Sequence, residues 1–339
     1  MVVPGSIPKM IFSTLKFYVL CFVLNSISYK SKQFLWLVFK LLIVILCTYF
    51  IYDVLAKNKE LKIDTFYSFL KDFNIFSTKN MFFLLIFSSF NWFFEIMKWK
   101  SLVSRIESIS WSNAAKQSLA SLSFSLITPN RIGEYGAKAM YFEKSQRKNV
   151  LLLNFIGNFH QLLITLIIGY AGMLYLKTFL KNIISEINYD IISGILIFSV
   201  FIFTLLTITN WYKKLRHKFL TRFDFITKKL NLKISLLSLL RYFIFSHQFY
   251  FLLMIFDIDI SYLDAMAGIS SMYFLSSIVP MLALFDFALK GSIAILVFGV
   301  FEINPMVILT ITALMWVLNF AFPAIIGSYF VLRFKPIQS

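Results

Sequence analysis

One stretch of the sequence combines residue types that could hold an anion, Thr128-Pro-Asn-Arg-Ile-Gly-Glu-Tyr-Gly-Ala-Lys138. Proline lacks a backbone donor and disfavours helix at the preceding residue, so Pro129 is expected to end one helix before another begins. In the second helix Arg131, Glu134 and Lys138 are spaced i, i+3 and i+7, which places them on one face. Guanidinium and ammonium groups bind phosphate, and a carboxylate can fix the arginine. We therefore predict an anion site; the alternative is that Lys138 and Arg131 only anchor a helix at a membrane surface.

Further polar residues stand inside apolar stretches and could join this site. Arg241 is either a phosphate ligand or a structural partner of Glu134 or Asp286. Asp286 and Lys290 have i, i+4 spacing after Pro280, so they either face the site or neutralise each other. The residues that we predict to contact a substrate are Arg131, Glu134, Lys138, Asn158, Arg241, Gln248, Asp286 and Lys290.

Other polar groups favour structural roles. Asn154, Asn158 and Gln161 form a stripe at i, i+4 and i+7, which predicts hydrogen bonds between helices. Glu95 and Lys98, at the end of an apolar stretch, are interpreted as an ion pair at the membrane interface rather than a proton relay. Gly133 and Gly136 are expected to allow close packing of the helix that carries Arg131, Glu134 and Lys138.

Metal and nucleotide sites are not predicted. His160 and His247 have no second His, Cys or carboxylate at ligand spacing, so a buried or hydrogen-bonded role is expected for both. No P-loop, dinucleotide fingerprint, Gly-x-Ser-x-Gly or His-Glu-x-x-His motif is present. The sequence therefore predicts no cofactor and no nucleotide-driven pump.

The elements that position these residues must lie in a membrane. The 339 residues are 59% hydrophobic and 14% charged, with a mean hydropathy of +0.78, whereas soluble domains carry about 25% charged residues. The net charge of +17 comes from Lys and Arg in short loops between apolar stretches. Basic loops beside anionic lipid explain this charge, so a nucleic-acid partner is not expected.

Six stretches are apolar and long enough to span a bilayer. Two others, residues 114–142 and 265–300, are each broken by a proline and predict paired half-helices. Residues 10–27 are short and contain Lys16, so they form an interfacial helix or an optional extra span, and no small-residue cleavage site marks a signal peptide. The predicted spans are Phe34–Leu55, Met81–Met97, Val150–Leu176, Ile191–Trp211, Ser235–Phe256 and Pro305–Leu332.

Loop charges predict the orientation. Residues 213–233 carry eight Lys and Arg against Asp224, so this loop and the C-terminus are expected to be cytoplasmic in a multi-pass protein of the cell (inner) membrane. The acidic loop at Asp257 and Asp259 then lies outside, whereas residues 57–79 are placed outside against their own charge. The loops can lie on these sides only if each broken region begins and ends on the same side of the membrane. Each region is therefore a re-entrant hairpin, or it crosses the membrane twice with two very short helices.

The chain also divides into two similar halves, 34–176 and 191–333, after an N-terminal segment 1–33. Corresponding first spans, central prolines and last spans are offset by 157, 151 and 155 residues. The first spans start on opposite sides, as in an inverted-topology repeat whose broken helices meet near the midplane. The alternative is that any protein with eight such segments can be divided in this way. The fold class predicted is an all-α, polytopic membrane bundle of six spans and two broken hairpins.

The motif Pro129-Asn-Arg-Ile-Gly-Glu134, after a serine-rich apolar segment, resembles the P-x-R-x-G-E motif of the lysylphosphatidylglycerol synthase transmembrane-region family, also called flippase-like integral membrane proteins. The similarity covers roughly residues 34–333. The second hairpin departs from the family, because Phe287, Ala288 and Leu289 stand where glycines are usual. Weaker matches are Lys98-Trp99, Arg241-Tyr242, Gln248, and Pro280 followed by Asp286 and Lys290.

The resemblance implies a domain that moves lipids between leaflets. Relatives that make aminoacylated lipids carry a soluble catalytic domain, for which these 339 residues have no room, so lysyl-lipid synthesis is not expected. We therefore predict a lipid translocase whose partner is a membrane lipid with a phosphate-bearing head group. The alternatives are an intramembrane enzyme on a lipid-linked sugar or phosphate, with Glu134 or Asp286 as base, and an accessory subunit of envelope or glycan assembly. The sequence leaves homo-oligomer formation open.

Overall fold

The computed structural model describes residues 77–126, 131–177, 227–279 and 286–334, together with Phe73, Ile75 and Thr128. Within these residues all regular structure is helical and no strand occurs. The N-terminal segment 1–33, the predicted spans 34–55 and 191–211, and residues 213–226 of the basic loop lie outside this part of the chain.

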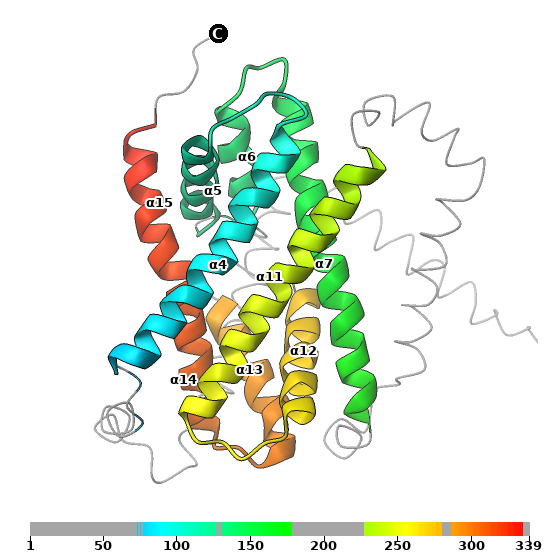
Figure 1. Cartoon of the computed structure of the whole chain (residues 1–339), viewed down its shortest axis with the longest axis vertical. Helices are drawn as coiled ribbons and strands as arrows, with labels where there is room; N and C mark the ends of the chain where they lie inside the picture. The colour runs from blue at the N-terminus through cyan, green and yellow to red at the C-terminus, as the bar shows by residue number, and fades with distance from the viewer. Residues whose placement is uncertain are drawn as a thin grey trace, which may run out of the picture.

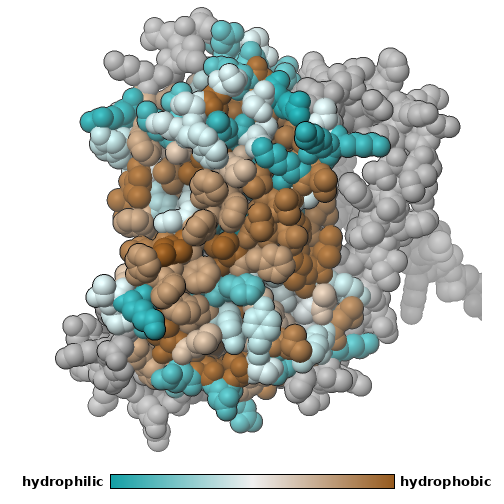
Figure 2. Space-filling model, in the orientation of Figure 1, coloured by the Kyte–Doolittle hydropathy of each residue, from teal (hydrophilic) through white to brown (hydrophobic). Residues whose placement is uncertain are grey.

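Four helices of the described part are long and apolar enough to cross a membrane: α4 (Thr78–Val103), α7 (Arg147–Tyr175), α11 (Lys228–Ile255) and the continuous helix Pro305–Val331. They confirm four of the six predicted spans as apolar helices. Figure 2 shows the matching surface, a hydrophobic band between two hydrophilic ends. An exposed hydrophobic band of this kind is typical of a protein surface that contacts the hydrocarbon core of a bilayer.

The start of α11 corrects the sequence prediction. The basic loop was expected to reach residue 233, but the helix begins at Lys228, so three of its lysines lie in the first two turns. Thr227 caps the helix by accepting a hydrogen bond from the backbone N–H of Leu230 at 3.2 Å. Lysine is a good helix former, and a capped start extends the helix beyond its apolar part.

Two pairs of shorter helices lie at opposite ends of the bundle (Figure 1). One pair is α5 (Trp111–Leu126) and α6 (Ile132–Met140), and the other is α12 (Tyr262–Ile278) and α13 (Asp286–Phe298), which a 3₁₀ turn, η3 (Gly299–Phe301), follows. In each pair the first helix ends before the predicted break, at residue 129 or 280, and the second helix begins after it. Helix α5 packs beside α15 and α6, and α12 packs beside α7.

The last membrane helix contains an irregular turn. It consists of α14 (Pro305–Trp316), the π-helical turn η4 (Val317–Ala321) and α15 (Phe322–Leu332). Pro323 in the first turn of α15 has no N–H to donate, so carbonyls one turn earlier need other partners. Side chains of α4 supply them: Ser88 Oγ donates to Leu318 O at 2.6 Å and Trp92 Nε1 to Asn319 O at 3.1 Å.

Candidate functional site

A cavity of about 680 Å³ lies in the middle of the bundle. Residues of both short helix pairs and of all four long helices line it. Three described lining residues are cations, Arg131, Arg241 and Lys290, and no described lining residue is a carboxylate. The remaining polar and aromatic lining residues are Asn91, Trp92, Tyr135, Asn158, Gln161, Thr165, Phe245, Phe249, Tyr273, Ser276, Ser277, Thr312, Trp316, Asn319 and Phe320.

Arg131 stands at the break before α6. It is the N-cap residue and adopts the left-handed conformation, with φ 57° and ψ 26°. A non-glycine residue rarely adopts this conformation, which costs roughly 1 kcal/mol or more and recurs at binding sites. The guanidinium is 3.5 Å from Glu134 Oε2 and lies over the Phe320 ring at 5.8 Å. Because 44% of the side chain is exposed, Arg131 can still reach a ligand in the cavity.

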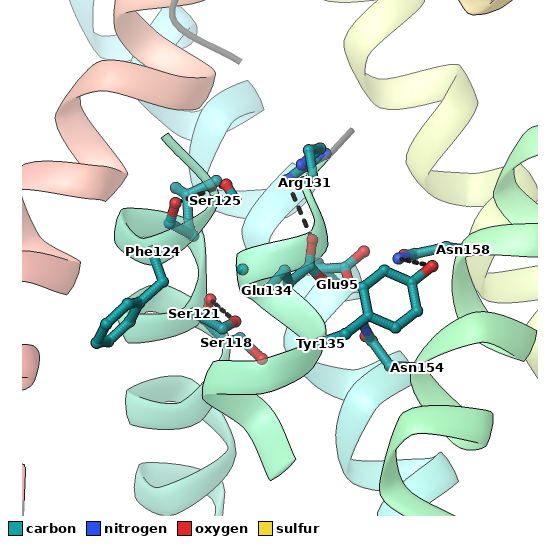
Figure 3. A network of polar contacts seen from close by, with 12 residues as sticks. Glu95, Ser118, Ser121, Phe124, Ser125, Arg131, Glu134, Tyr135, Asn154 and Asn158 are labelled. Atoms are coloured by element: carbon teal, nitrogen blue, oxygen red, sulfur yellow. Dashed lines mark hydrogen bonds and ion pairs between the residues drawn. The ribbon is translucent and has the colours of Figure 1, made fainter. Parts of the chain in front are cut away.

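Glu134 and Lys138 are not among the residues that line the cavity. Figure 3 shows the Arg131 side chain directed toward Glu134. Both are buried, and Lys138 Nζ donates to Glu134 Oε1 at 2.9 Å and to Asn154 Oδ1 at 2.8 Å. The same ammonium lies 4.5 Å from the centre of the Trp99 ring. The predicted one-face arrangement of the three charged residues is therefore present, with Arg131 at the cavity and the other two supporting it.

The glycines of this motif differ in their surroundings. A side chain at Gly133 would collide with the backbone of Phe124, so the predicted close packing of α6 on α5 is confirmed there. A Cβ at Gly136 would meet nothing within 4 Å, so the prediction of close packing is wrong for this position.

Arg241 lies near the middle of α11 and is paired with a carboxylate that the sequence analysis did not assign to it. Its Nη1 donates to Glu95 Oε2 at 2.6 Å, and its Nε donates to Asn91 Oδ1 at 2.8 Å. Glu95 also lies 2.7 Å from Lys98 Nζ. The predicted pair of Glu95 and Lys98 exists, but both residues are buried rather than exposed at an interface. The sequence analysis gave Glu134 or Asp286 as the possible structural partner of Arg241, and the structure shows Glu95 instead. Sequence spacing could not choose among carboxylates on helices far apart in the chain.

An amide chain continues from Arg241 to the π-helical turn. Asn91 Nδ2 donates to Asn319 Oδ1 at 2.8 Å, and Asn319 Nδ2 donates to Gln248 Oε1 at 2.8 Å. Gln248, predicted to contact substrate, is fully buried and donates to Leu84 O at 3.1 Å, so it is placed outside the cavity wall. Asn91 and Asn319 were missed because single asparagines in apolar stretches show no spacing pattern.

The other wall of the cavity comes from α7, α12 and α13. Lys290 Nζ lies 5.8 Å from the centre of the Tyr273 ring. Asp286 begins α13, and its side chain lies outside the described part of the chain. The polar stripe on α7 makes the predicted contacts between helices: Asn158 donates to Tyr135 OH at 3.2 Å and Gln161 to Ser238 O at 3.3 Å.

Both candidate histidines have local hydrogen bonds. His160 Nδ1 is 2.8 Å from Ile156 O, and His247 Nδ1 is 2.8 Å from Phe243 O. In the residues that the structure describes, no three His, Cys, Asp or Glu side chains are grouped as metal ligands.

Charged side chains gather around the cavity. Arg131, Arg241 and Lys290 face it, and Lys98 and Lys138 lie behind the two arginines. Glu134 pairs with Arg131 and Lys138, and Glu95 pairs with Arg241 and Lys98. Such charge is costly at membrane depth unless water or an anion reaches it. The arrangement suits an anionic group of a ligand that enters the cavity.

No family model, no curated protein and no solved structure matches this chain.

Proposed function

We propose that this chain is a lipid translocase of the cell membrane that moves a lipid with an anionic, phosphate-bearing head group between leaflets without hydrolysing a nucleotide. The observation that carries the proposal is the cavity, because the guanidinium groups of Arg131 and Arg241 both belong to its wall. Arg131 and Arg241 can each give charge-assisted hydrogen bonds to phosphate oxygens, and Lys290 adds a third positive charge. The likeness of Pro129-Asn-Arg-Ile-Gly-Glu134 to the flippase-like family agrees with this function.

The proposal includes an inverted repeat with two re-entrant hairpins, α5–α6 from one side and α12–α13 from the other. Two contacts support the repeat. A Cβ at Gly172 of α7 would collide with Ser270 of α12, and one at Gly327 of α15 would collide with Leu119 of α5. Gly172 and Gly327 are 155 positions apart, and Leu119 and Ser270 are 151 apart. These are the offsets that separate the last spans and the prolines of the two halves.

The repeat gives a simple route for transport. The head group binds in the central cavity while its acyl or prenyl chains stay in the bilayer, so only the polar part needs protein contacts. Rocking of one half against the other, around helices α4 and α11, would expose the cavity to one leaflet and then to the other. The basic segment 213–233, whose last residues form the start of α11, and the C-terminus are cytoplasmic in this arrangement.

Leaflet exchange in liposomes tests the function. Proteoliposomes would contain a fluorescent anionic phospholipid with the label on its acyl chain, and dithionite would quench the label in the outer leaflet only. We expect the wild-type protein to raise the exchange rate above protein-free liposomes, and Arg131→Ala to lower the protein-dependent rate about tenfold or more, because a charge-assisted hydrogen bond contributes roughly 1.5–3 kcal/mol. Arg105→Ala is the matched control, because Arg105 is exposed and bonds Thr227 away from the cavity. Equal rates for wild type and Arg131→Ala would reject the proposal.

A further inference from the structure

We infer that Asn91 and Asn319 are positioning residues for head-group binding, because they hold the guanidinium of Arg241 in the orientation in which it meets the phosphate. The inference rests on the proposed function and adds two residues to its binding machinery. It comes from the chain of side-chain hydrogen bonds that joins Arg241 on α11 to the last membrane helix through α4. All three residues line the cavity.

The guanidinium of Arg241 retains donors for a ligand. It has five N–H groups, and the structure uses one on Nε, toward Asn91 Oδ1, and one on Nη1, toward Glu95 Oε2. No hydrogen bond within the described part of the chain uses Nη2, so three N–H groups remain for phosphate oxygens. Both existing contacts are needed, since a planar group that is held by only one hydrogen bond can still turn about it.

The two ends of the hydrogen-bond chain determine the direction of every amide in it. Arg241 can only donate, and a backbone carbonyl, Leu84 O, can only accept. Asn91 must therefore present its oxygen to Arg241, at 2.8 Å, and its nitrogen to Asn319 Oδ1, at 2.8 Å. Asn319 then donates to Gln248 Oε1 at 2.8 Å, and Gln248 Nε2 donates to Leu84 O at 3.1 Å. A reversed amide at any point would place two donors or two acceptors against each other.

Asn319 keeps Asn91 in this direction. An amide group that turned by 180° at residue 91 would present its N–H groups to the Nε–H of Arg241. Asn319 opposes the turn because its oxygen accepts from Asn91, while its nitrogen is held by Gln248 Oε1 and by Met315 O at 3.1 Å. Asn91 is 3% exposed and Gln248 is fully buried, so water has little access to replace these partners. A residue of the last membrane helix thereby orients an arginine on α11.

A double-mutant cycle tests this positioning role against a merely structural one. Asn319→Leu removes the acceptor for Asn91 and should lower protein-dependent leaflet exchange of an anionic phospholipid about fivefold, the factor that corresponds to roughly 1 kcal/mol for one neutral hydrogen bond. In a chain that already carries Asn91→Asp, the same substitution should change the rate less than about twofold. A carboxylate has two oxygens and no N–H group, so it accepts from Arg241 in either orientation and needs no partner on the last helix. Each ratio compares chains with the same residue 91, so the charge added by Asn91→Asp cancels.

Two further variants separate positioning from damage to the fold. Asn319→Ala removes the same acceptor without adding bulk and should repeat the result of Asn319→Leu. Ser88→Ala is the control, because Ser88 also joins α4 to the irregular turn, through Leu318 O at 2.6 Å, but is not among the residues that line the cavity. This variant should leave the exchange rate of folded protein unchanged, whatever its effect on unfolding in detergent.

The outcomes distinguish a failure of the positioning role from a failure of the proposed function. An Asn319→Leu rate equal to wild type, or the same fall with and without Asn91→Asp, would overturn the positioning role and leave the translocase intact. A wild-type protein that gives no exchange above protein-free liposomes would reject the translocase, and the head-group role of Arg241 with it.

Discussion

At the scale of single residues, Glu95 has the central electrostatic role. Its carboxylate lies between Arg241 of α11 and Lys98 of α4, at 2.6 Å and 2.7 Å, and all three side chains are largely removed from solvent. Arg241 therefore has a fixed position at the cavity rather than a mobile one. Removing a carboxylate that compensates two buried cations leaves both cations unpaired, and this loss destabilises the folded protein.

Glu95→Gln should lower the free energy of unfolding by about 3 kcal/mol, because it leaves Lys98 and Arg241 without their counter-ion. Thermal and denaturant unfolding of the purified protein in detergent measures the change. A second substitution, Lys98→Met, should recover part of the loss by removing one unpaired charge. Glu143→Gln, in an exposed position between α6 and α7, is the control. A Glu95→Gln protein within about 0.5 kcal/mol of wild type would show that the pair is not structural.

At the scale of elements, the sequence predicts what depends on local composition and misses what depends on contacts. Apolar length predicts α4, α7, α11 and the last membrane helix, and the prolines predict both interruptions. The π-helical turn was not predicted. Carbonyls of this turn accept hydrogen bonds from Ser88 and Trp92, which come from a helix far away in the sequence.

Close helix contacts give a prediction at this scale. Gly172→Ala and Gly327→Ala should each lower the free energy of unfolding by about 1–3 kcal/mol, because the new Cβ collides with the neighbouring helix. Gly136→Ala should be neutral or stabilising by roughly 0.5 kcal/mol, since its Cβ meets nothing and alanine favours helix. Unfolding in detergent compares the three variants. Similar losses at residues 172 and 327 are expected from the repeat, and a loss at only one of them would argue against it.

At the scale of the whole molecule, the two short helix pairs lie at opposite ends, with the cavity between them. The sequence indicated this organisation through its offsets, whereas the composition of the cavity wall required the structure. Of the residues predicted to contact a substrate, Arg131, Asn158, Arg241 and Lys290 line the cavity, whereas Glu134, Lys138 and Gln248 are not among its lining residues. Spacing along one helix predicts which residues share a face. It does not predict which of those residues line a cavity.

The proposed orientation can be tested by cysteine labelling. In a chain with Cys21→Ser and Cys47→Ser, which removes both native cysteines, Ser145→Cys or Asp259→Cys would be introduced into exposed loops. The loop charges place residues 138–148 on the cytoplasmic side and Asp259 outside. An impermeant maleimide added to intact cells should therefore label residue 259 and leave residue 145 unlabelled until the membrane is opened. Labelling of both loops from the same side would contradict the proposed topology.

The central claim is that an anionic lipid head group enters the cavity, and photo-crosslinking at the cavity wall tests it most directly. The photoreactive residue p-benzoylphenylalanine would replace Phe245, which lines the cavity, or Phe322, which is exposed on the outer surface. Radiolabelled anionic phospholipid should form an adduct at both positions. Arg131→Ala should abolish the adduct at residue 245 and leave the adduct at residue 322 unchanged. No adduct at residue 245, or one that does not depend on Arg131, would contradict the account.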